Sequence, residues 1–367
     1  MSKLKRDPIL AVSLALAIAS CFLIFPDEKY ASYINWKTLS LLFSLMAVTA
    51  GMKSIVVFDR LVNALLSHIH SLRLISILIV LISTFMSMFL TNDVTLVTLV
   101  PFTILLFNET DSKGLRNTLI METIGANLGS MLTPFGNPQN LFLYTTYGIS
   151  FSGFIMFMLP YFLLSLMIIL VMTLIVSPKG ETGQVQTSMK GPKMDYLRFA
   201  IYLSLFFIAI LSVAGFIDHI IVFAAVIIAM LLLSPHVLAK VDYSLLLTFI
   251  FFFIFIGNIG RLPAVSTFLK KIVTDHEMLT GIIASQFVSN VPAAILLSGF
   301  TDNGKALLLG TDIGGLGTII ASMASVITIK QYSRLGGKTG KYLITFTILN
   351  VIALAILTIF ALSQGIC

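Results

Sequence analysis

The hydrophobic positions of this chain fall into long runs, and two pairs of runs are interrupted near their middles by polar, turn-forming residues. In the first half the interruptions are 91–93 (Thr-Asn-Asp) and 133–140 (Thr-Pro-Phe-Gly-Asn-Pro-Gln-Asn). In the second half, 289–292 (Ser-Asn-Val-Pro) and the Gly-, Ser- and Thr-rich stretch 312–325 hold matching positions. Irregular backbone at membrane depth is tolerated only where protein buries it or where it lines a cavity. Paired interruptions in two related halves therefore indicate the substrate site of a secondary transporter.

The apolar runs predict an all-α polytopic membrane protein. Hydrophobic residues fill 57% of the 367 positions, charged residues fill 11%, and the mean hydropathy is +1.01. A soluble protein carries about 25% charged residues. We expect spans at 8–25, 36–55, 151–176, 198–215, 219–234, 242–259 and 341–363, hairpins at 72–107 and 278–300, and broken spans at 117–148 and 304–330.

Two further segments, 56–70 and 261–275, show apolar and polar faces with helical period, so we expect each to lie along a membrane surface. Each hairpin arm is shorter than the roughly 20 residues that cross the hydrocarbon core, so we expect both hairpins to be re-entrant. The chain then crosses the membrane nine times. We expect its N-terminus to be cytoplasmic and its C-terminus to lie outside the plasma (inner) membrane.

The basic residues support this topology. It leaves 17 of the 23 Lys and Arg residues inside, as the positive-inside rule requires. The six outside are Lys29, Lys37, Arg261, Lys270, Lys271 and Lys305. This bias accounts for the formal net charge of +7, so we expect the lipid bilayer, and no nucleic acid, as a partner.

The two halves repeat one order of elements: span, span, surface helix, hairpin, broken span, span. Residues 89–92 align without gaps with 287–290, and 128–130 align with 316–318, which places Thr133 on Ala321. An unpaired connector span reverses the second unit, so the repeat is inverted. We expect a first repeat at 1–176, an inner loop and connector at 177–215, and an inverted second repeat at 216–367.

Three acids, Asp93, Glu122 and Asp312, fall within apolar segments, where ionisable residues are costly and mark function. Asp93 is the best candidate for ion coupling, as a sodium ligand or as a proton carrier. Its counterpart in the second half is Val291, so Asp312 is the nearest acid that could act there. For Glu122, an interfacial or capping role is an equal alternative.

Each hairpin turn ends one helix and begins another, and helix N-termini present free N–H groups with a partial positive charge. Thr91 and Asn92 in the first turn, and Ser289 and Asn290 in the second, add side-chain donors and acceptors. Such a site suits an oxyanion or a polar neutral hydroxide. A capping role alone is the alternative.

The interrupted segments resemble the signatures of a known superfamily. Residues 91–95 (Thr-Asn-Asp-Val-Thr) followed by Pro101, and 125–127 (Gly-Ala-Asn) leading to 133–140, resemble the ion transporter superfamily. The citrate-transporter-like, arsenite-permease-like group is the closest, and divalent-anion/sodium symporters are more distant. The resemblance covers nearly the whole chain. It implies an inverted-repeat, elevator-type transporter with two re-entrant hairpins and two broken helices in a mobile domain, and a scaffold that is usually dimeric, so we expect a homodimer.

The turns, the acids and the resemblance together give the expected site. The solute-binding residues are Thr91, Asn92, Thr133, Asn137, Ser289, Asn290 and Thr318. The ion-coupling residues are Asp93, Gly136, Asn140 and Asp312, with a possible sodium ion near Asn92, Asp93 and Asn137. The second half lacks a Thr-Pro-x-Gly-Asn string and carries Val291 and Pro292 after its Ser-Asn pair, which argues against dicarboxylate transport and a second sodium site.

We therefore expect a secondary-active transporter of a small inorganic or organic anion, driven by protons or sodium and working without a cofactor other than a possible sodium ion. An arsenite or antimonite efflux permease and a sodium/proton antiporter are alternatives within the superfamily. A passive ion channel is an alternative of another class. The sequence carries no His/Glu metal cluster and no nucleophile–base pair that would indicate an enzyme.

Overall fold

The structure of the chain is a computed structural model that describes residues 8–55, 57, 60, 69, 71–107, 112–178, 195–336 and 339–367, and these residues form helices and no strand. The predicted surface helix 56–70 and the polar loop 177–197 lie largely outside the described residues. Within them, five helices are long and apolar enough to cross a membrane: α5 (Leu72–Leu90), α9 (Phe151–Val176), α10 (Tyr196–Val213), α13 (Tyr243–Gly260) and α19 (Thr339–Ser363). The expected all-α polytopic membrane protein is confirmed.

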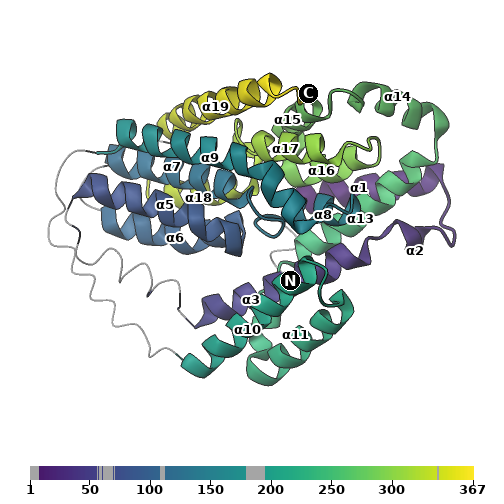
Figure 1. Ribbon diagram of the computed structural model, residues 1–367, viewed down its shortest axis with the longest axis horizontal. Coiled ribbons are helices and arrows are strands. Elements are labelled where there is room, and N and C mark those ends of the chain that lie inside the picture. Colours follow the sequence, from purple (N-terminus) through teal and green to yellow (C-terminus); the bar gives the residue numbers. More distant parts are fainter. Residues whose placement is uncertain are drawn as a thin grey trace.

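The helices pack into two groups (Figure 1). The flanking group, residues 8–55 and 195–276, contains α10, α13 and the helices α1 (Pro8–Leu23), α2 (Tyr30–Tyr33), α3 (Trp36–Ser54), α11 (His219–Leu233), α12 (Pro235–Leu238) and α14 (Pro263–Val273). The hairpin group, residues 72–107, 112–176, 277–336 and 339–367, contains α5, α9, α19 and the helices α6 (Asn92–Phe107), α7 (Ser112–Ser130), α8 (Pro138–Thr146), α15 (Glu277–Val288), α16 (Asn290–Ser298), α17 (Gly304–Gly314), η2 (Ile319–Ala321) and α18 (Met323–Ser333).

Both predicted hairpins are present as pairs of packed helices, α5 with α6 and α15 with α16. A single residue separates the helices of each pair, Thr91 in the first and Ser289 in the second. The expectation that every arm is too short to cross a membrane is wrong for α5, which has 19 residues and the composition of a span. The arms α15 and α16 have 12 and 9 residues.

The two separating residues have nearly the same unusual backbone conformation. Thr91 has φ 67° and ψ 149°, and Ser289 has φ 74° and ψ 153°. This region is essentially restricted to glycine, and a residue with a side chain costs about 1–3 kcal/mol there. Asn92 and Asn290 follow, and each side-chain oxygen accepts a hydrogen bond from the next backbone N–H at 2.9 Å. The two turns are therefore structural copies of each other.

The predicted broken spans are also present. The first breaks between α7 and α8, and Asn137 caps α8 by accepting the Asn140 N–H at 2.9 Å, with Pro138 in the first helical turn. Gly136 sits in this break because a Cβ there would lie 2.1 Å from the Ser130 carbonyl oxygen. The second break runs from the end of α17 through η2 to α18.

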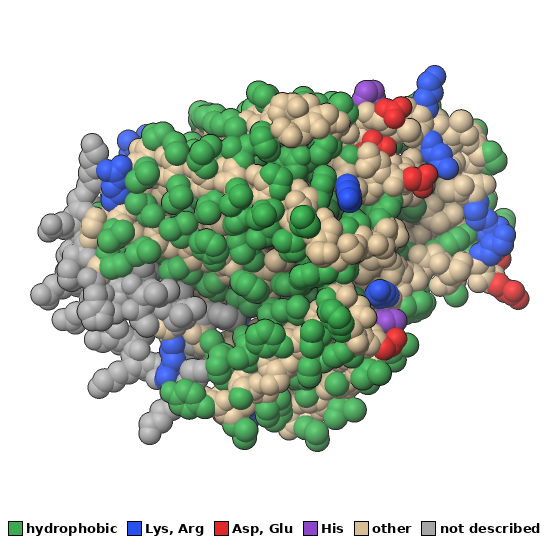
Figure 2. Space-filling model, viewed as in Figure 1, with side chains coloured by type: hydrophobic (Ala, Val, Ile, Leu, Met, Phe, Trp, Pro, Cys, Tyr) green, Lys and Arg blue, Asp and Glu red, His purple; other side chains and the backbone are tan. Residues whose placement is uncertain are grey.

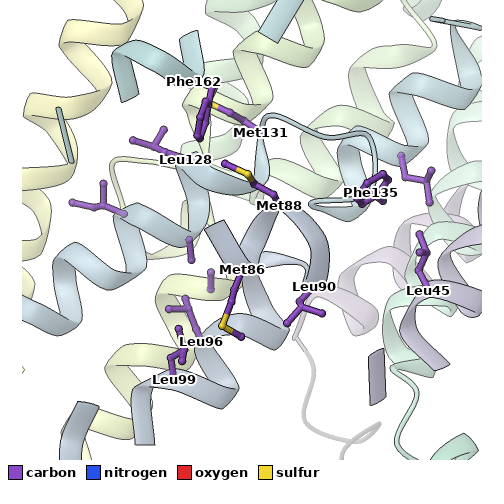
Figure 3. Packing of buried hydrophobic residues seen from close by; sticks show 14 of the residues in the cluster. Leu45, Met86, Met88, Leu90, Leu96, Leu99, Leu128, Met131, Phe135 and Phe162 are labelled. Atoms are coloured by element: carbon purple, nitrogen blue, oxygen red, sulfur yellow. The ribbon is translucent and has the colours of Figure 1, made fainter. Parts of the chain in front are cut away.

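The broken helices pack closely on the hairpins. On α7, a Cβ at Gly129 would lie 2.0 Å from the carbonyl oxygen of Thr84 on α5, so only glycine allows this approach. Figure 3 shows part of the buried apolar cluster around the first hairpin, with Met86 of α5 beside Leu96 and Leu99 of α6. This packing holds the hairpin turn against the break in the neighbouring span.

The seam between the two groups is mainly apolar, and α3 and α13 of the flanking group meet α8 and α16 of the hairpin group there. Phe142 of α8 packs against Phe249 and Phe253 of α13, with ring centroids 5.9 and 5.5 Å apart. Hydrogen bonds join the groups through α8: the Thr38 and Thr145 hydroxyls lie 2.6 Å apart, and the Tyr144 hydroxyl donates to the Val213 carbonyl at 2.8 Å.

Apolar side chains cover much of the visible surface in Figure 2, and the charged ones on this face lie mainly toward the two ends of the long axis. An apolar surface of this kind suits contact with lipid. The predicted surface helix 261–275 is present as α14 and exposes Val265, Phe268 and Ile272. These apolar side chains fit its expected place along a membrane surface.

Candidate functional site

The two hairpin turns meet at a small cavity of about 40 Å³ between the hairpin group and the flanking group. Asn92 and Asp93 line it from the first hairpin, and Ser289 and Asn290 line it from the second. The other lining residues are Ile9, Pro138, Gln139, Asp242, Leu245, Thr248, Val291, Pro292, Ser322 and Met323. Four residues predicted from the turns are thus brought together in space.

Asn127 of α7 links the two halves beside this cavity. Its side-chain oxygen accepts from the Asn92 amide at 2.9 Å and from the Ser322 hydroxyl at 3.0 Å. Its own amide donates to the Gly315 carbonyl at 3.4 Å. Gly315 is the residue that aligns with Asn127, and a Cβ there would lie 3.0 Å from the Asn290 amide nitrogen. Each turn asparagine therefore lies beside the matching position of the broken span in its own half.

Asp312 lies next to the cavity, buried at 3% exposure. Its Oδ1 accepts from the amides of Asn137 at 3.0 Å and Gln139 at 3.3 Å. Its Oδ2 is buried, and no described residue hydrogen-bonds to it. Gln139 also lines the cavity, so it connects the cavity to this carboxyl group. The acid of one half is thus held by amides of the other half.

Several predicted site residues do not line the cavity. Thr133 donates to the Met88 carbonyl at 2.5 Å, and Asn140 donates to three carbonyls in the break, at 3.3–3.4 Å. Gly136 packs within that break, and Thr91 is half-buried in its turn. These residues support the shape of the site.

Thr318 is exposed, and its hydroxyl donates to the Gln286 carbonyl at 3.1 Å. Gln286 aligns with Met88, so Thr318 makes the contact that Thr133 makes in the first half. The sequence alignment, which placed Thr133 on Ala321, is therefore offset from the hydrogen bonds by three residues. Gln286 also donates to the carbonyls of Gly314 and Leu316 at 2.9 and 3.0 Å, which holds the second break.

Glu122 is neither interfacial nor a cap. It is fully buried within α7, where Thr103 of α6 donates to its Oε2 at 2.8 Å. It does not line the cavity, and it is separated along α7 from the break by two turns. Glu122 thus belongs to the interior of the hairpin group.

Sequence reasoning did not assign roles to Asn127, Gln139, Gln286, Ser322 and Asp242. Asn127 and Gln139 stood within the strings that carry the resemblance, so a signal existed for both. Asp242 has the sequence context of an ordinary helix cap, and it does accept the Leu245 N–H at 3.1 Å. Only the packing of α13 against α16 of the second hairpin shows that it lines the cavity.

A larger cavity, about 790 Å³, lies elsewhere, between α14, the 299–303 loop and the end of α19. Its lining carries charges of both signs, including Lys270, Lys305 and Glu277, and no residue of either turn. No group of three or more His, Cys, Asp or Glu side chains suited to a metal ion occurs in the described part of the chain. The small cavity at the turns is therefore the better candidate.

Comparison with known families decides what kind of protein carries this site. A family model described as citrate transporter matches residues 2–303. The chain belongs to the citrate transporter family. The family resemblance expected from the sequence is confirmed, and this member of the citrate transporter family is a membrane transporter.

The names of relatives of this citrate transporter family member also describe transporters or membrane proteins. It is 32% identical over 355 residues to an uncharacterized transporter of Methanocaldococcus jannaschii, covering 96% of both chains. It is 31% identical over 317 residues to the inner membrane protein YbiR of Escherichia coli, covering 85% of this chain and 84% of YbiR. It is 32% identical over 160 residues to the silicon efflux transporter LSI3 of Oryza sativa, covering 44% of this chain and 33% of LSI3.

Proposed function

We propose that the protein is a secondary-active transporter that binds one small solute between its two hairpin turns and works by an elevator movement. The observation that carries the proposal is that Asn92 and Asn290, from matching turns in the two halves, line one cavity. The cavity is bounded by both helix groups, and the seam between them is mainly apolar. Sliding the hairpin group along the flanking group would then carry the solute.

The repeats would be inverted, with both hairpins re-entrant. The N-terminus would be cytoplasmic, the C-terminus outside the plasma membrane, and the carrier a homodimer in the bilayer. The copied backbone of Thr91 and Ser289 supports the internal repeat. The positive-inside bias supports the orientation.

The solute would be a small inorganic or organic anion. The helices α6 and α16 begin at the cavity, so their first N–H groups and the Asn92 and Asn290 amides could bind oxygen atoms of an anion. Two carboxyl groups, Asp93 and Asp242, and no Lys or Arg line the described cavity. An anion would be repelled there unless a cation or proton accompanied it, which favours coupling to sodium or protons.

Asp93 and Asp312 would carry the coupling. Both have a buried carboxylate oxygen to which no described group donates a hydrogen bond, namely Asp93 Oδ1 and Asp312 Oδ2. A buried charge is retained only when it is paired, so each oxygen would bind a proton or a sodium ion during the cycle. Asp312 would act through Gln139 and Asn137, its hydrogen-bond partners.

A neutral, hydroxyl-bearing solute is the second candidate, as in an arsenite, antimonite or silicic acid efflux permease. The specific observation in its favour is the lining of amides, hydroxyls and carboxyls without a basic side chain. Partial similarity to a silicon efflux transporter agrees with it. A sodium/proton antiporter would need only Asp93 and Asp312, as the groups that bind the two ions. A passive channel would need no movement of the hairpin group.

The deciding experiment is a binding screen followed by transport. The purified full-length protein is heated with citrate, sulfate, arsenite or silicic acid, with and without sodium, because a ligand of the folded state raises its melting temperature. Solutes that stabilise the protein are then tested for uptake into proteoliposomes. Uptake against a gradient, driven by sodium or protons, supports the proposal, whereas currents far above carrier turnover would establish a channel. Loss of the thermal shift in Asn290→Ala would place the solute at the cavity.

A further inference from the structure

Asp242 is an acid that the flanking group contributes to the cavity. It is the N-cap of α13, where one carboxylate oxygen, Oδ1, accepts the Leu245 N–H at 3.1 Å. The residue is exposed, and it lines the cavity opposite the hairpin turns. Asp93, at the start of α6, lines the same cavity from the first hairpin. Two like charges facing one small cavity attract a cation.

A second, independent observation at the cavity also points to a cation. The Gln139 side chain lines the cavity and is 1% exposed, and its Oε1 receives no hydrogen bond from the described residues. A buried oxygen of this kind is costly unless a donor or a cation meets it. The hydroxyls of Ser289, Ser322 and Thr248 also belong to the lining.

We propose that Asp242 is the fixed half of a sodium site whose moving half is Asp93. The inference rests on the proposed function, because it requires that the hairpin group moves relative to the flanking group. Carboxylate, amide and hydroxyl oxygens are suitable ligands for a hard cation. The volume of about 40 Å³ is enough for an ion with water.

The division of the site between two groups would make ion binding depend on the state of the carrier. Asp93 moves with the hairpin, whereas Asp242 stays on α13. Only one position of the hairpin group brings both carboxyl groups to the cavity, so sodium binds that position more tightly. A ligand that prefers one state shifts the population toward it, which is the linkage that a coupled carrier needs.

The test changes the charge of Asp242 and keeps its cap. Asn and Ser both cap helices well, so Asp242→Asn and Asp242→Ser should fold. Asp218→Asn is the matched control, because Asp218 caps α11 of the same group by accepting the Ile220 N–H at 2.8 Å and does not line the cavity. Melting of the full-length protein is followed while sodium chloride replaces choline chloride at constant ionic strength and pH.

We expect sodium to raise the melting temperature of the wild type and of Asp218→Asn. In both Asp242 variants the sodium concentration for half of the shift should rise about tenfold or more, because a charged ligand is lost. Asp93→Asn should lose the shift. Equal sodium responses in Asp242→Asn and Asp218→Asn would overturn the proposal, and so would a wild type that responds to pH but not to sodium.

Uptake in proteoliposomes separates the role of Asp242 in sodium binding from the transport activity of the protein. If uptake depends on sodium, Asp93→Asn abolishes that dependence and Asp242→Asn keeps it unchanged, then only the role of Asp242 is wrong. If sodium binding behaves as expected but the wild type moves none of the solutes that stabilise it, then the site stands and the proposed transport activity fails.

Discussion

Thr91 and Ser289, one in each half of the chain, share a backbone conformation that is otherwise restricted to glycine, with φ 67° and 74° and ψ 149° and 153°. Strain of this kind persists only where the surrounding structure enforces it, and it is concentrated at functional sites. In both halves it places the following asparagine at the cavity. The strain is therefore part of what positions the two amides.

The first prediction concerns this strain. Thr91→Gly should raise the stability of the folded protein by about 1 kcal/mol, because glycine adopts this conformation freely but also gains freedom in the unfolded chain. Thr91→Ala retains a Cβ and should not gain. Thermal melting of the purified variants is the measurement. A Thr91→Gly variant less stable than Thr91→Ala would show that the turn is not strained.

The second prediction concerns the turn asparagines. Asn92→Ala and Asn290→Ala should each weaken solute affinity at least about tenfold, because a hydrogen bond to a charged group contributes roughly 1.5–3 kcal/mol. Uptake by proteoliposomes at several solute concentrations measures the change. Asn303→Ala, which removes the cap of α17 and does not line this cavity, is the control. Wild-type uptake by either turn variant would reduce that turn to a helix cap.

The third prediction concerns coupling by Asp93. Asp93→Asn imitates the neutral carboxyl group, so the variant should bind the solute yet lose its dependence on the driving ion. It should exchange solute across the membrane and fail to concentrate it. Counterflow and gradient-driven uptake in the same vesicles separate the two activities. If the variant still accumulates solute with the normal ion dependence, Asp312→Asn becomes the next variant to measure.

The fourth prediction concerns topology. In a variant without Cys21 and Cys367, a cysteine at Ser188 should resist an impermeant thiol reagent in intact cells, because the charge distribution predicts that the 177–197 loop lies inside. A cysteine at Ser32, an exposed residue of α2, should react readily. Labelling at Ser188 in intact cells would reverse the proposed orientation.

Much of the fold could be predicted because the residues that end its helices are recognisable in the local sequence. Proline, glycine and asparagine mark the breaks, so the predicted span 151–176 coincides with α9, and both hairpin turns fall within the predicted segments. The packing of α5 could not be predicted from the sequence. Its length as a span was missed because the polar turn after it indicated a short hairpin arm, although the apolar run before the turn has 19 residues.

The candidate site was predicted only in part. Asn92 and Asn290 could be found because a polar turn within an apolar run is costly unless it is used. Asn127 and Gln139 lie within the strings that carry the resemblance, but their partners, like the place of Asp242 at the cavity, depend on contacts between segments far apart in sequence. The offset at Thr318 has the same origin, because the two breaks have different lengths and the hydrogen bond to Gln286 fixes the true correspondence.

The short, rigid helix α8 connects the site to the seam between the hairpin group and the flanking group. Asn137 and Gln139 at its start hold Asp312, and Thr145 and Thr146 at its end meet Thr38 and Asn35 of the flanking group. Nine residues of helix span about 13 Å and bend little. Protonation of Asp312, or binding of an ion to it, would consequently affect the hydrogen bonds at the other end of α8 without passing through any loop. Loss of the hydrogen bonds between α8 and the flanking group would then occur together with the binding of an ion or solute at the site.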